Sequence, residues 1–435
     1  MSMDFPQFRK LEGAPNLYII EGPKHVTEWQ PMGDGKWVVH QHYASDYPRY
    51  QWVTELLQGD DPVRALTADA WEALYSERSE ASAELAPGRM PWPPMRSPWQ
   101  EKAAVGPLTT FGAAAHAQCL AEVASDADVR WALEDRGELP LMVLGGGSNV
   151  LMHRDWTGRM LHMNIRGVQK IADDGDAVEV VVGAGESWHA WVMHALDAGW
   201  NGLENLALIP GSVGASPMQN IGAYGVEVKD RFAWLEAIHR ETGALERFDA
   251  ERCAFGYRDS VFKQAEKDKW VIVRVAFRLQ RSAALNTHYG AIQAELQTRG
   301  WDAGTTHLQV AEAVMAIRQS KLPDPREIGN AGSFFKNPVV SKEAFERIQR
   351  EHPEVAHYPA PDGKVKLAAG WLIDRAGWKG HRRGACGVHD RQALVLVNHG
   401  GATGAEVWAL ALDIVADVES KYGVRLEPEV NQVGL

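Results

Sequence analysis

Two stretches decide the fold: LPLMVLGGGSNVLM at residues 139–152 and IPGSVGASPMQNIGAYG at residues 209–225. In the first, an apolar run of strand length leads directly into Gly145, Gly146 and Gly147, followed by Ser148 and Asn149. Glycine permits turns with positive φ and close approach of the backbone, and both supply the converging N–H groups that hold phosphate oxygens. The two stretches are therefore candidate pyrophosphate loops.

Each loop has a simpler interpretation as a tight turn. Neither matches the Rossmann fingerprint or the Walker loop, so no nucleotide site of those kinds is implied. For the first loop, binding and turn formation are equally supported. The second contains more glycine and small polar residues than a connection requires, which favours ligand binding.

Outward from these loops, the sequence alternates between strand and helix signals, and a second region with its own strands follows Lys321. We find no internal repeat, and the expected fold class is α+β with mixed sheets. The expected strands are residues 139–146, 178–186, 270–280 and 393–399, with a hairpin over 234–248 that turns at Thr242 and Gly243. The expected helices are residues 187–199, which Gly199 can terminate, and 407–423, which ends at Gly423.

The first block, residues 1–86, has ordinary structural signals. Strands are expected at LYIIEG (17–22) and KWVVHQHYA (36–44), and helices at YQWVTELL (50–57) and TADAWEALYSER (67–78). Residues 87–99, PGRMPWPPMRSPW, are dense in proline, which blocks both helix and sheet ladders. This segment is a stiff connector or an ordered strap, and its tryptophans favour a strap packed on a neighbour.

Length and composition bound the function. At 435 residues the chain is expected to form two to four domains, and a net charge of −12 argues against a general binder of nucleic acid or anionic membranes. Cys119, Cys253 and Cys386 lie far apart, match no metal spacing and fit a reducing compartment. The start of the chain lacks an apolar signal core, and no apolar run reaches membrane-spanning length. We expect a cytoplasmic monomer.

Eight motifs, in order along the chain, give a specific family resemblance. Together they resemble the UDP-N-acetylenolpyruvoylglucosamine reductase (MurB) family, in the form with a tyrosine-bearing loop before KLPDP, over about residues 104–435. The motifs are LGGGSNVLM, GLENLALIPGSVGASPMQNIGAYGVE, CAFGYRDSVFK, KLPDP, GNAGSFFKNPVVS, VKLAAGWLIDRAG, VHDRQALVLVN and LEPEV.

The resemblance implies an architecture and a reaction. It implies an FAD-binding domain of the vanillyl-alcohol-oxidase (PCMH) type at 104–282 and a C-terminal α+β substrate-binding domain at 283–435, of which 283–321 connects the two. FAD would be held non-covalently, and NADPH would reduce it before a nucleotide sugar, UDP-N-acetylglucosamine enolpyruvate, enters the same pocket. The product, UDP-N-acetylmuramate, is a peptidoglycan precursor, which would tie the protein to cell-wall synthesis, cell shape and division.

The reaction adds a hydride to the β-carbon of the enolpyruvyl group and a proton to its α-carbon. An enolate-like charge then develops on the substrate carboxylate, so catalysis needs a proton donor and electrostatic support. By motif, Ser333 would be the proton donor, and Arg258 and Glu429 would polarise the carboxylate. Glu429 would act as a neutral acid, because proximity to a like charge raises its pKa.

The other family positions are assigned to cofactor and substrate. Arg318 and Lys321 are three residues apart at an expected helix end, so both can face one diphosphate. The residues that would hold FAD are Gly145, Gly146, Gly147, Ser148, Asn149, Pro210, Gly211, Ser212, Gly214, Ala215, Ser216, Gln219, Asn220 and Gly222. Those that would bind the substrate are Tyr224, Tyr289, Arg318, Lys321, Asn337 and Gln392.

Alternatives remain beside this assignment. Taken singly, Ser333 could be a turn former, Glu429 a solvated residue, and Arg258 the partner of Asp259. An FAD-dependent oxidase, or a non-catalytic protein that binds nucleotide sugars, would retain parts of the pattern, but neither needs a proton donor at Ser333. Residues 1–100 match no family that we recognise; they could be an interaction module, a regulatory lid or a structural brace, and a brace is preferred.

Overall fold

The computed structural model describes residues 99–301 and 304–434 in full, together with the backbone of five strands in residues 7–66. These five form an antiparallel sheet in the order β4-β3-β2-β1-β5. The expected strands at 17–22 and 36–44 are confirmed, whereas the helices expected at 50–57 and 67–78 lie outside the described residues. The strands are β1 (Gln7–Leu11), β2 (Leu17–Gly22), β3 (His25–Pro31), β4 (Trp37–Tyr43) and β5 (Val63–Leu66).

Trp99, the last residue of the proline-rich segment, packs against the next domain. Its ring lies 5.7 Å from that of Trp131, its Nε1 donates to Asp135 at 2.7 Å, and the Arg159 guanidinium lies 4.6 Å from its centroid. The rest of the expected strap, residues 87–98, lies outside the described residues, so the strap itself stays a prediction.

Residues 100–282 form the FAD-like region, for which the family resemblance implies FAD binding. Its first part is a mixed sheet in the order β6-β7-β10-β8. β10 runs parallel to both β7 and β8, and β6 runs antiparallel to β7. Because the carboxyl ends of parallel strands share one edge, β8 delivers the first glycine loop to that edge. The elements are β6 (Gln100–Ala104), β7 (His116–Val123), α3 (Asp126–Asp135), β8 (Leu141–Leu144), β9 (Val150–Met152) and β10 (Trp156–Met163).

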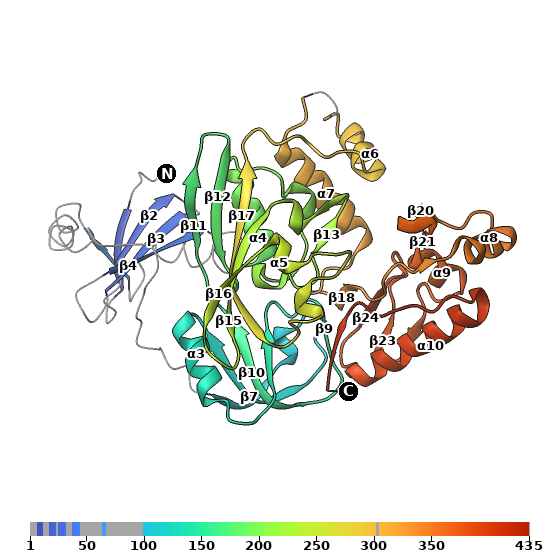
Figure 1. The fold of residues 1–435 in the computed structure, drawn as a ribbon, viewed down its shortest axis with the longest axis horizontal. Helices are drawn as coiled ribbons and strands as arrows, with labels where there is room; N and C mark the ends of the chain where they lie inside the picture. The colour runs from blue at the N-terminus through green and yellow to red at the C-terminus, as the bar shows by residue number, and fades with distance from the viewer. Residues whose placement is uncertain are drawn as a thin grey trace.

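The second part is an antiparallel sheet in the order β11-β12-β17-β15-β16, covered by α4 (Figure 1). The expected hairpin and long strand are confirmed, and α4 ends just before Gly199, whose φ of 72° suits a helix terminus. The elements are β11 (Val168–Asp173), β12 (Ala177–Gly183), α4 (Trp188–Asp197), η3 (Glu204–Leu206), η4 (Val213–Ala215), β13 (Gly222–Ala223), β14 (Val226–Glu227), η5 (Val228–Asp230), β15 (Phe232–His239), β16 (Leu245–Asp249), α5 (Ala250–Cys253), η6 (Val261–Lys263) and β17 (Trp270–Gln280).

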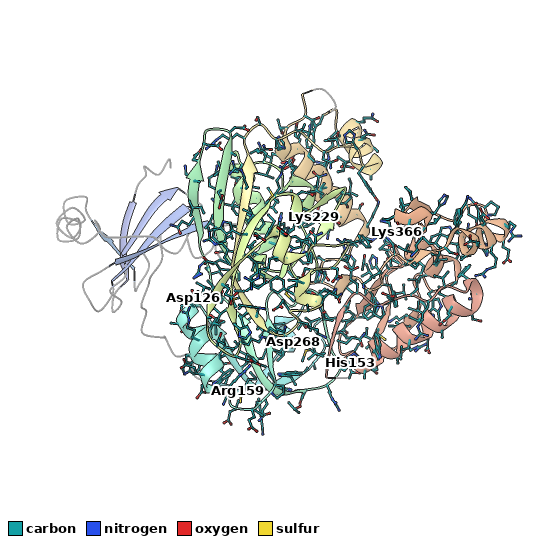
Figure 2. The ribbon with its side chains drawn as sticks, viewed as in Figure 1. Asp126, His153, Arg159, Lys229, Asp268 and Lys366 are labelled. Atoms are coloured by element: carbon teal, nitrogen blue, oxygen red, sulfur yellow. The ribbon has the colours of Figure 1, made fainter. Side chains whose placement is uncertain are left out.

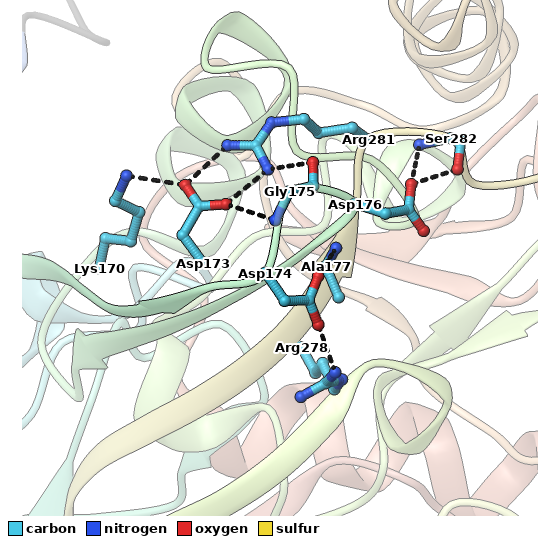
Figure 3. Close-up of polar contacts among 9 residues, drawn as sticks. All are labelled: Lys170, Asp173, Asp174, Gly175, Asp176, Ala177, Arg278, Arg281 and Ser282. Carbon is cyan, nitrogen blue, oxygen red and sulfur yellow. Dashed lines mark hydrogen bonds and ion pairs between the residues drawn. The ribbon is translucent and has the colours of Figure 1, made fainter.

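A network of ion pairs fastens the β11–β12 turn to the end of β17 (Figure 3). Arg281 contacts both carboxylate oxygens of Asp173, at 2.8 and 2.9 Å, and Lys170 contacts the same carboxylate at 2.9 Å. Arg278 pairs with Asp174 at 3.0 Å. These charges are largely exposed, so they hold the register of the turn more than they add stability.

Two helices from residues 283–321 pack on the second part of the FAD-like region. Buried residues of α6 (Gly290–Thr298) and α7 (His307–Lys321) belong to one hydrophobic cluster with Trp188, Trp191 and Phe277. The expected connecting segment therefore shares its core with the FAD-like side of the molecule.

The C-terminal domain lies beside this region and holds its own core (Figure 1). Its main sheet has the order β18-β24-β23-β22, and the last helix, α10, packs its predicted face inward and ends at Gly423, where φ is 65°. The expected strand at 393–399 and the final helix are confirmed. The elements are β18 (Gly329–Ser333), β19 (Val339–Val340), α8 (Lys342–Glu351), β20 (His357–Pro359), β21 (Val365–Leu367), α9 (Ala369–Arg375), β22 (Arg382–Arg383), β23 (Cys386–Val388), β24 (Val395–Asn398), α10 (Gly404–Tyr422) and β25 (Asn431–Val433).

The chain then crosses back to the first domain. β25 pairs in parallel with β9, the strand that follows the first glycine loop. Just before β25, Pro428 bridges to Phe335. The segment between these two contacts carries Glu429, so the fold fixes it between the domains.

Candidate active site

The two glycine-rich loops lie against each other beyond the end of β8. A Cβ atom at Gly146 would lie 2.9 Å from Gly211 Cα, closer than real Cβ contacts allow. A Cβ at Gly211, where φ is 119°, would lie 2.7 Å from Ser148 Oγ, which itself donates to Pro210 O at 3.1 Å. The glycines are thus required for the approach of the two loops.

The rest of the first loop is equally tight. A side chain at Gly145 would overlap Ser212 Oγ, and one at Gly147, where φ is 58°, would overlap Leu108 O. Thr110 N donates to Gly147 O at 3.1 Å and holds the loop on the other side. The two loops together form a glycine cradle, in which closely packed backbone and two serine side chains, Ser148 and Ser212, can hold a diphosphate such as that of FAD. Four further residues expected at the cofactor continue along the second loop: Gly214, Ala215, Ser216 and Gly222.

Asn149 and Gln219 join this cradle to the end of the chain. Asn149 Nδ2 lies 3.2 Å from both Gln219 Oε1 and Glu429 O. Asn220 is fully buried with φ of 44°, and its Nδ2 donates to Gly256 O at 3.0 Å. Asn220 therefore holds the loop that leads to Arg258.

Arg258 and Glu429 form an ion pair between the two domains. Arg258 Nε lies 3.2 Å from Glu429 Oε1, and the side chains are only 23% and 14% exposed. Arg258 also donates from Nη2 to Gly222 O at 2.7 Å, and its backbone has a φ of 53°. The alternative partner, Asp259, instead accepts from Gln264 at 2.9 Å. A left-handed arginine held at both ends is a strained, fixed group of the kind found at functional sites.

Burial raises the pKa of Glu429, while Arg258, Lys263 and Lys336 oppose that rise. A raised pKa is the direction that the sequence analysis expects for Glu429, but in the free protein its cause is desolvation and not a neighbouring carboxylate. Lys263 Nζ also donates to Arg258 O at 3.3 Å. The sequence reasoning did not assign Lys263 or Lys336, although both stand within the quoted motifs CAFGYRDSVFK and GNAGSFFKNPVVS.

Ser333 lies at the end of β18, directly before the segment that pairs with Glu429. Glu429 N donates to Phe334 O at 2.8 Å, and Lys336 N donates to Glu427 O at 2.9 Å. Gly332, with φ of 69°, turns the strand there and leaves Ser333 exposed. The fold thus brings Ser333 and Glu429 onto adjacent, hydrogen-bonded segments, with Arg258 facing them from the other domain.

Tyr224, Tyr289 and Arg318 lie together on the FAD-like side. The two tyrosine rings are 5.2 Å apart at 89°, and a side-chain hydrogen bond joins Arg318 to Tyr224. Arg318 Nε donates to Leu208 O at 3.2 Å, whereas Lys321 is exposed. Some of the N–H groups of Arg318 are therefore already hydrogen-bonded within the protein.

Asn337 and Gln392 lie in the C-terminal domain near the start of α9. Asn337 Oδ1 accepts from Ala369 N at 2.9 Å, and Gln392 Oε1 would lie 3.1 Å from a Cβ at Gly370. They form a second polar group, and no contact in the described residues joins them to the Tyr224 group.

A contact between the domains was missed by sequence reasoning. Lys366 Nζ lies 4.7 Å from the ring centroid of Tyr257, and Figure 2 shows Lys366 on the side of the C-terminal domain that faces the FAD-like region. Tyr257, Tyr289 and Tyr358 are each nearly half exposed. Tyr257 precedes Arg258, and that adjacency was the available signal.

The mixed sheet, the glycine cradle and the second, antiparallel sheet define an FAD-binding flavoprotein. A family model described as an FAD binding domain matches residues 117–249, and one described as the C-terminal domain of UDP-N-acetylenolpyruvoylglucosamine reductase matches residues 324–433. The chain belongs to the UDP-N-acetylenolpyruvoylglucosamine reductase family. The expected fold class is thereby confirmed.

Individual relatives agree with this. The chain is 52% identical over 336 residues to UDP-N-acetylenolpyruvoylglucosamine reductase of Pseudomonas putida, which covers 77% of this chain and 98% of the relative. It is 53% identical over 324 residues to that of Burkholderia multivorans, covering 74% and 93%. The crystal structure of the MurB reductase from Thermus caldophilus shares the fold, with 24% identity, a TM-score of 0.53, and 77% and 99% of the two chains covered. Among the described helices, none is long and apolar enough to cross a bilayer.

Proposed function

We propose that the protein reduces UDP-N-acetylglucosamine enolpyruvate to UDP-N-acetylmuramate, with FAD in the glycine cradle and NADPH as the source of hydride. The observation that carries this proposal is the Arg258–Glu429 pair, which lies beside Ser333 and is connected to the cradle through Asn149. When bound, FAD supplies the hydride chemistry. The chain itself has to bind the enolpyruvyl carboxylate and provide a proton.

Arg258 is the group that receives the substrate carboxylate in this proposal. Its guanidinium is fixed by Gly222 O, so it is oriented before substrate arrives. Lys263 and Lys336 add positive charge around the same point and support an enolate-like charge as it forms. In the free protein Glu429 pairs with Arg258. When the substrate carboxylate binds beside it, Glu429 takes up a proton and, as the neutral acid, donates a hydrogen bond to that carboxylate instead of repelling it.

Ser333 is the proton donor in this proposal. Its hydroxyl is exposed at the end of β18, one residue from the carbonyl that fixes the Glu429 backbone. A serine hydroxyl is a weak acid, but the enolate is strongly basic, and water can replace the proton at an exposed position. The proton passes from Ser333 Oγ to the α-carbon, and the hydroxyl then regains one from water.

Residues on both sides of the interface would hold the nucleotide sugar. Tyr224, Tyr289, Arg318 and Lys321 approach from the FAD-like side, and Asn337 and Gln392 from the C-terminal domain. We assign residues 104–282 to FAD binding, 283–435 to substrate binding with 283–321 as the connecting segment, and 1–100 to a structural brace. We place the protein in the cytoplasm as a monomer that supplies cell-wall synthesis.

Purified protein tests the proposal directly. Flavin absorbance and loss of NADPH absorbance are followed with and without the enolpyruvyl nucleotide sugar, and the expected result is NADPH oxidation that continues only with that substrate. Bound flavin without such oxidation would point to an oxidase or dehydrogenase instead. A colourless protein that still binds the nucleotide sugar would point to a binding protein.

A further inference from the structure

Leu208 stands at the entrance to the second glycine loop in an unusual backbone conformation. Its φ is 57°, in the left-handed region that costs a non-glycine residue roughly 1–2 kcal/mol. Leu208 is two residues before Pro210, so its conformation sets the direction in which the loop leaves. Something outside the loop has to hold it there.

Two side chains bind the backbone N–H and C=O groups of Leu208. His189, on α4, accepts a 3.1 Å hydrogen bond at Nδ1 from Leu208 N. Arg318, on α7, donates from Nε to Leu208 O at 3.2 Å. The two peptide groups on either side of the Leu208 Cα are therefore each held by a helix, one by α4, which precedes the loop in the sequence, and the other by α7, which follows it.

The chemistry of His189 matches this arrangement. A ring nitrogen accepts a backbone N–H only when it carries no proton, so Nδ1 has to be unprotonated. Burial lowers the pKa of His189, and the nearby charge of Arg318 lowers it further. Both effects keep the ring neutral and available as an acceptor.

The same peptide segment is also fixed at its start. Glu204, which is 2% exposed, accepts from Gly202 N at 2.7 Å and pairs with His307 at 2.8 Å. His307 is the first residue of α7, and Arg318 lies near its end. Residues 202–208 are thus attached to α7 at both ends, which leaves the following loop as a rigid extension of two packed helices.

We propose that His189 is a positioning residue for FAD, acting as a neutral acceptor that, with Arg318, holds Leu208 left-handed and so sets the position of residues 210–212. The inference rests on the proposed placement of FAD in the glycine cradle. His189 need not touch the cofactor, because its effect passes through the backbone of one residue.

Two variants of matched size separate this role from simple packing. His189→Asn retains an acceptor oxygen close to the position of Nδ1, whereas His189→Leu fills similar space and leaves Leu208 N without a partner. FAD release is measured on purified holoprotein from the rise in free-flavin fluorescence on dilution, and thermal denaturation is measured after the flavin has been removed. We expect FAD to bind within about threefold of wild type in His189→Asn and at least about tenfold more weakly in His189→Leu.

The outcomes are distinguishable. Equal FAD affinity in His189→Leu and wild type would overturn the inference, as would weakening by the same factor in both variants. If His189→Leu does not fold, His189→Gln replaces it, since its acceptor lies one carbon further out; affinity equal to that of His189→Asn would then count against positioning. If wild-type protein binds no FAD at all, the proposed function fails first.

Discussion

The close approach of the two glycine loops makes Gly146→Ala the most direct test of the FAD cradle. The added methyl would lie 2.9 Å from Gly211 Cα and 3.1 Å from Gly211 C, and both are backbone atoms that no rotamer change can move. Ordinary contact begins at 3.4 Å, so the loops have to separate by about 0.5 Å. Overpacking of this kind costs about 1–3 kcal/mol.

The separation should affect FAD more than it affects the fold. If it misaligns even one charge-assisted hydrogen bond from a backbone N–H to phosphate, about 1.5–3 kcal/mol of binding is lost. That corresponds to FAD affinity lower by roughly 10- to 100-fold. Flavin content after purification and flavin fluorescence on dilution measure it, and thermal denaturation measures the cost to the fold.

Gly290→Ala is the matched control. Gly290 begins α6, and a Cβ there would meet nothing within 4 Å. The same methyl should therefore leave stability and FAD affinity at the wild-type level. Wild-type FAD affinity in Gly146→Ala would refute the cradle, because the loops could then separate without consequence for the cofactor.

Three further predictions follow from other contacts. Ser333→Ala should still accept hydride from NADPH while product formation falls by about 10²- to 10⁴-fold in single-turnover assays; normal turnover would remove Ser333 as the proton donor. Because burial raises the pKa of Glu429, wild-type activity should fall as the pH rises through this raised pKa and Glu429 loses its proton. Glu429→Gln cannot ionise, so its pH–rate profile should lack this decline. An unchanged decline in Glu429→Gln would mean that another group causes the loss of activity. Trp99→Ala removes a ring that contacts Trp131 and Arg159, so the free energy of unfolding should drop by roughly 1–3 kcal/mol with FAD affinity retained, and loss of flavin without loss of stability would contradict the brace.

Local signals in the sequence were sufficient for many elements. The face and end of α10 follow from apolar spacing and Gly423, and the β15–β16 hairpin follows from Gly243, because both depend on neighbours in the chain. The family motifs also singled out Arg258 and Glu429, which the structure brings into contact; their catalytic roles stay predictions. Those motifs name residues without stating what each one contacts.

Long-range contacts could not be predicted in the same way. The sequence does not predict that β25 pairs with β9, because each strand has only three residues, too few to show a hydrophobic pattern. The left-handed backbone of Leu208 was equally hidden, because leucine gives no hint of positive φ and its partners, His189 and Arg318, lie on separate helices. The cause of the raised pKa of Glu429 likewise depends on burial that only the fold creates.

The return of the chain through β25 to β9 has a consequence for synthesis on the ribosome. Translation completes both glycine loops and most of the C-terminal domain before it reaches Glu429, and the pairing of residues 431–433 with β9 then adds to the contacts that hold Glu429 beside Arg258. A nascent or prematurely ended chain can therefore fold its flavin half while Arg258 still lacks its partner. In the proposed arrangement, reductase activity therefore cannot precede the docking of the segment that carries Glu429 between the two domains.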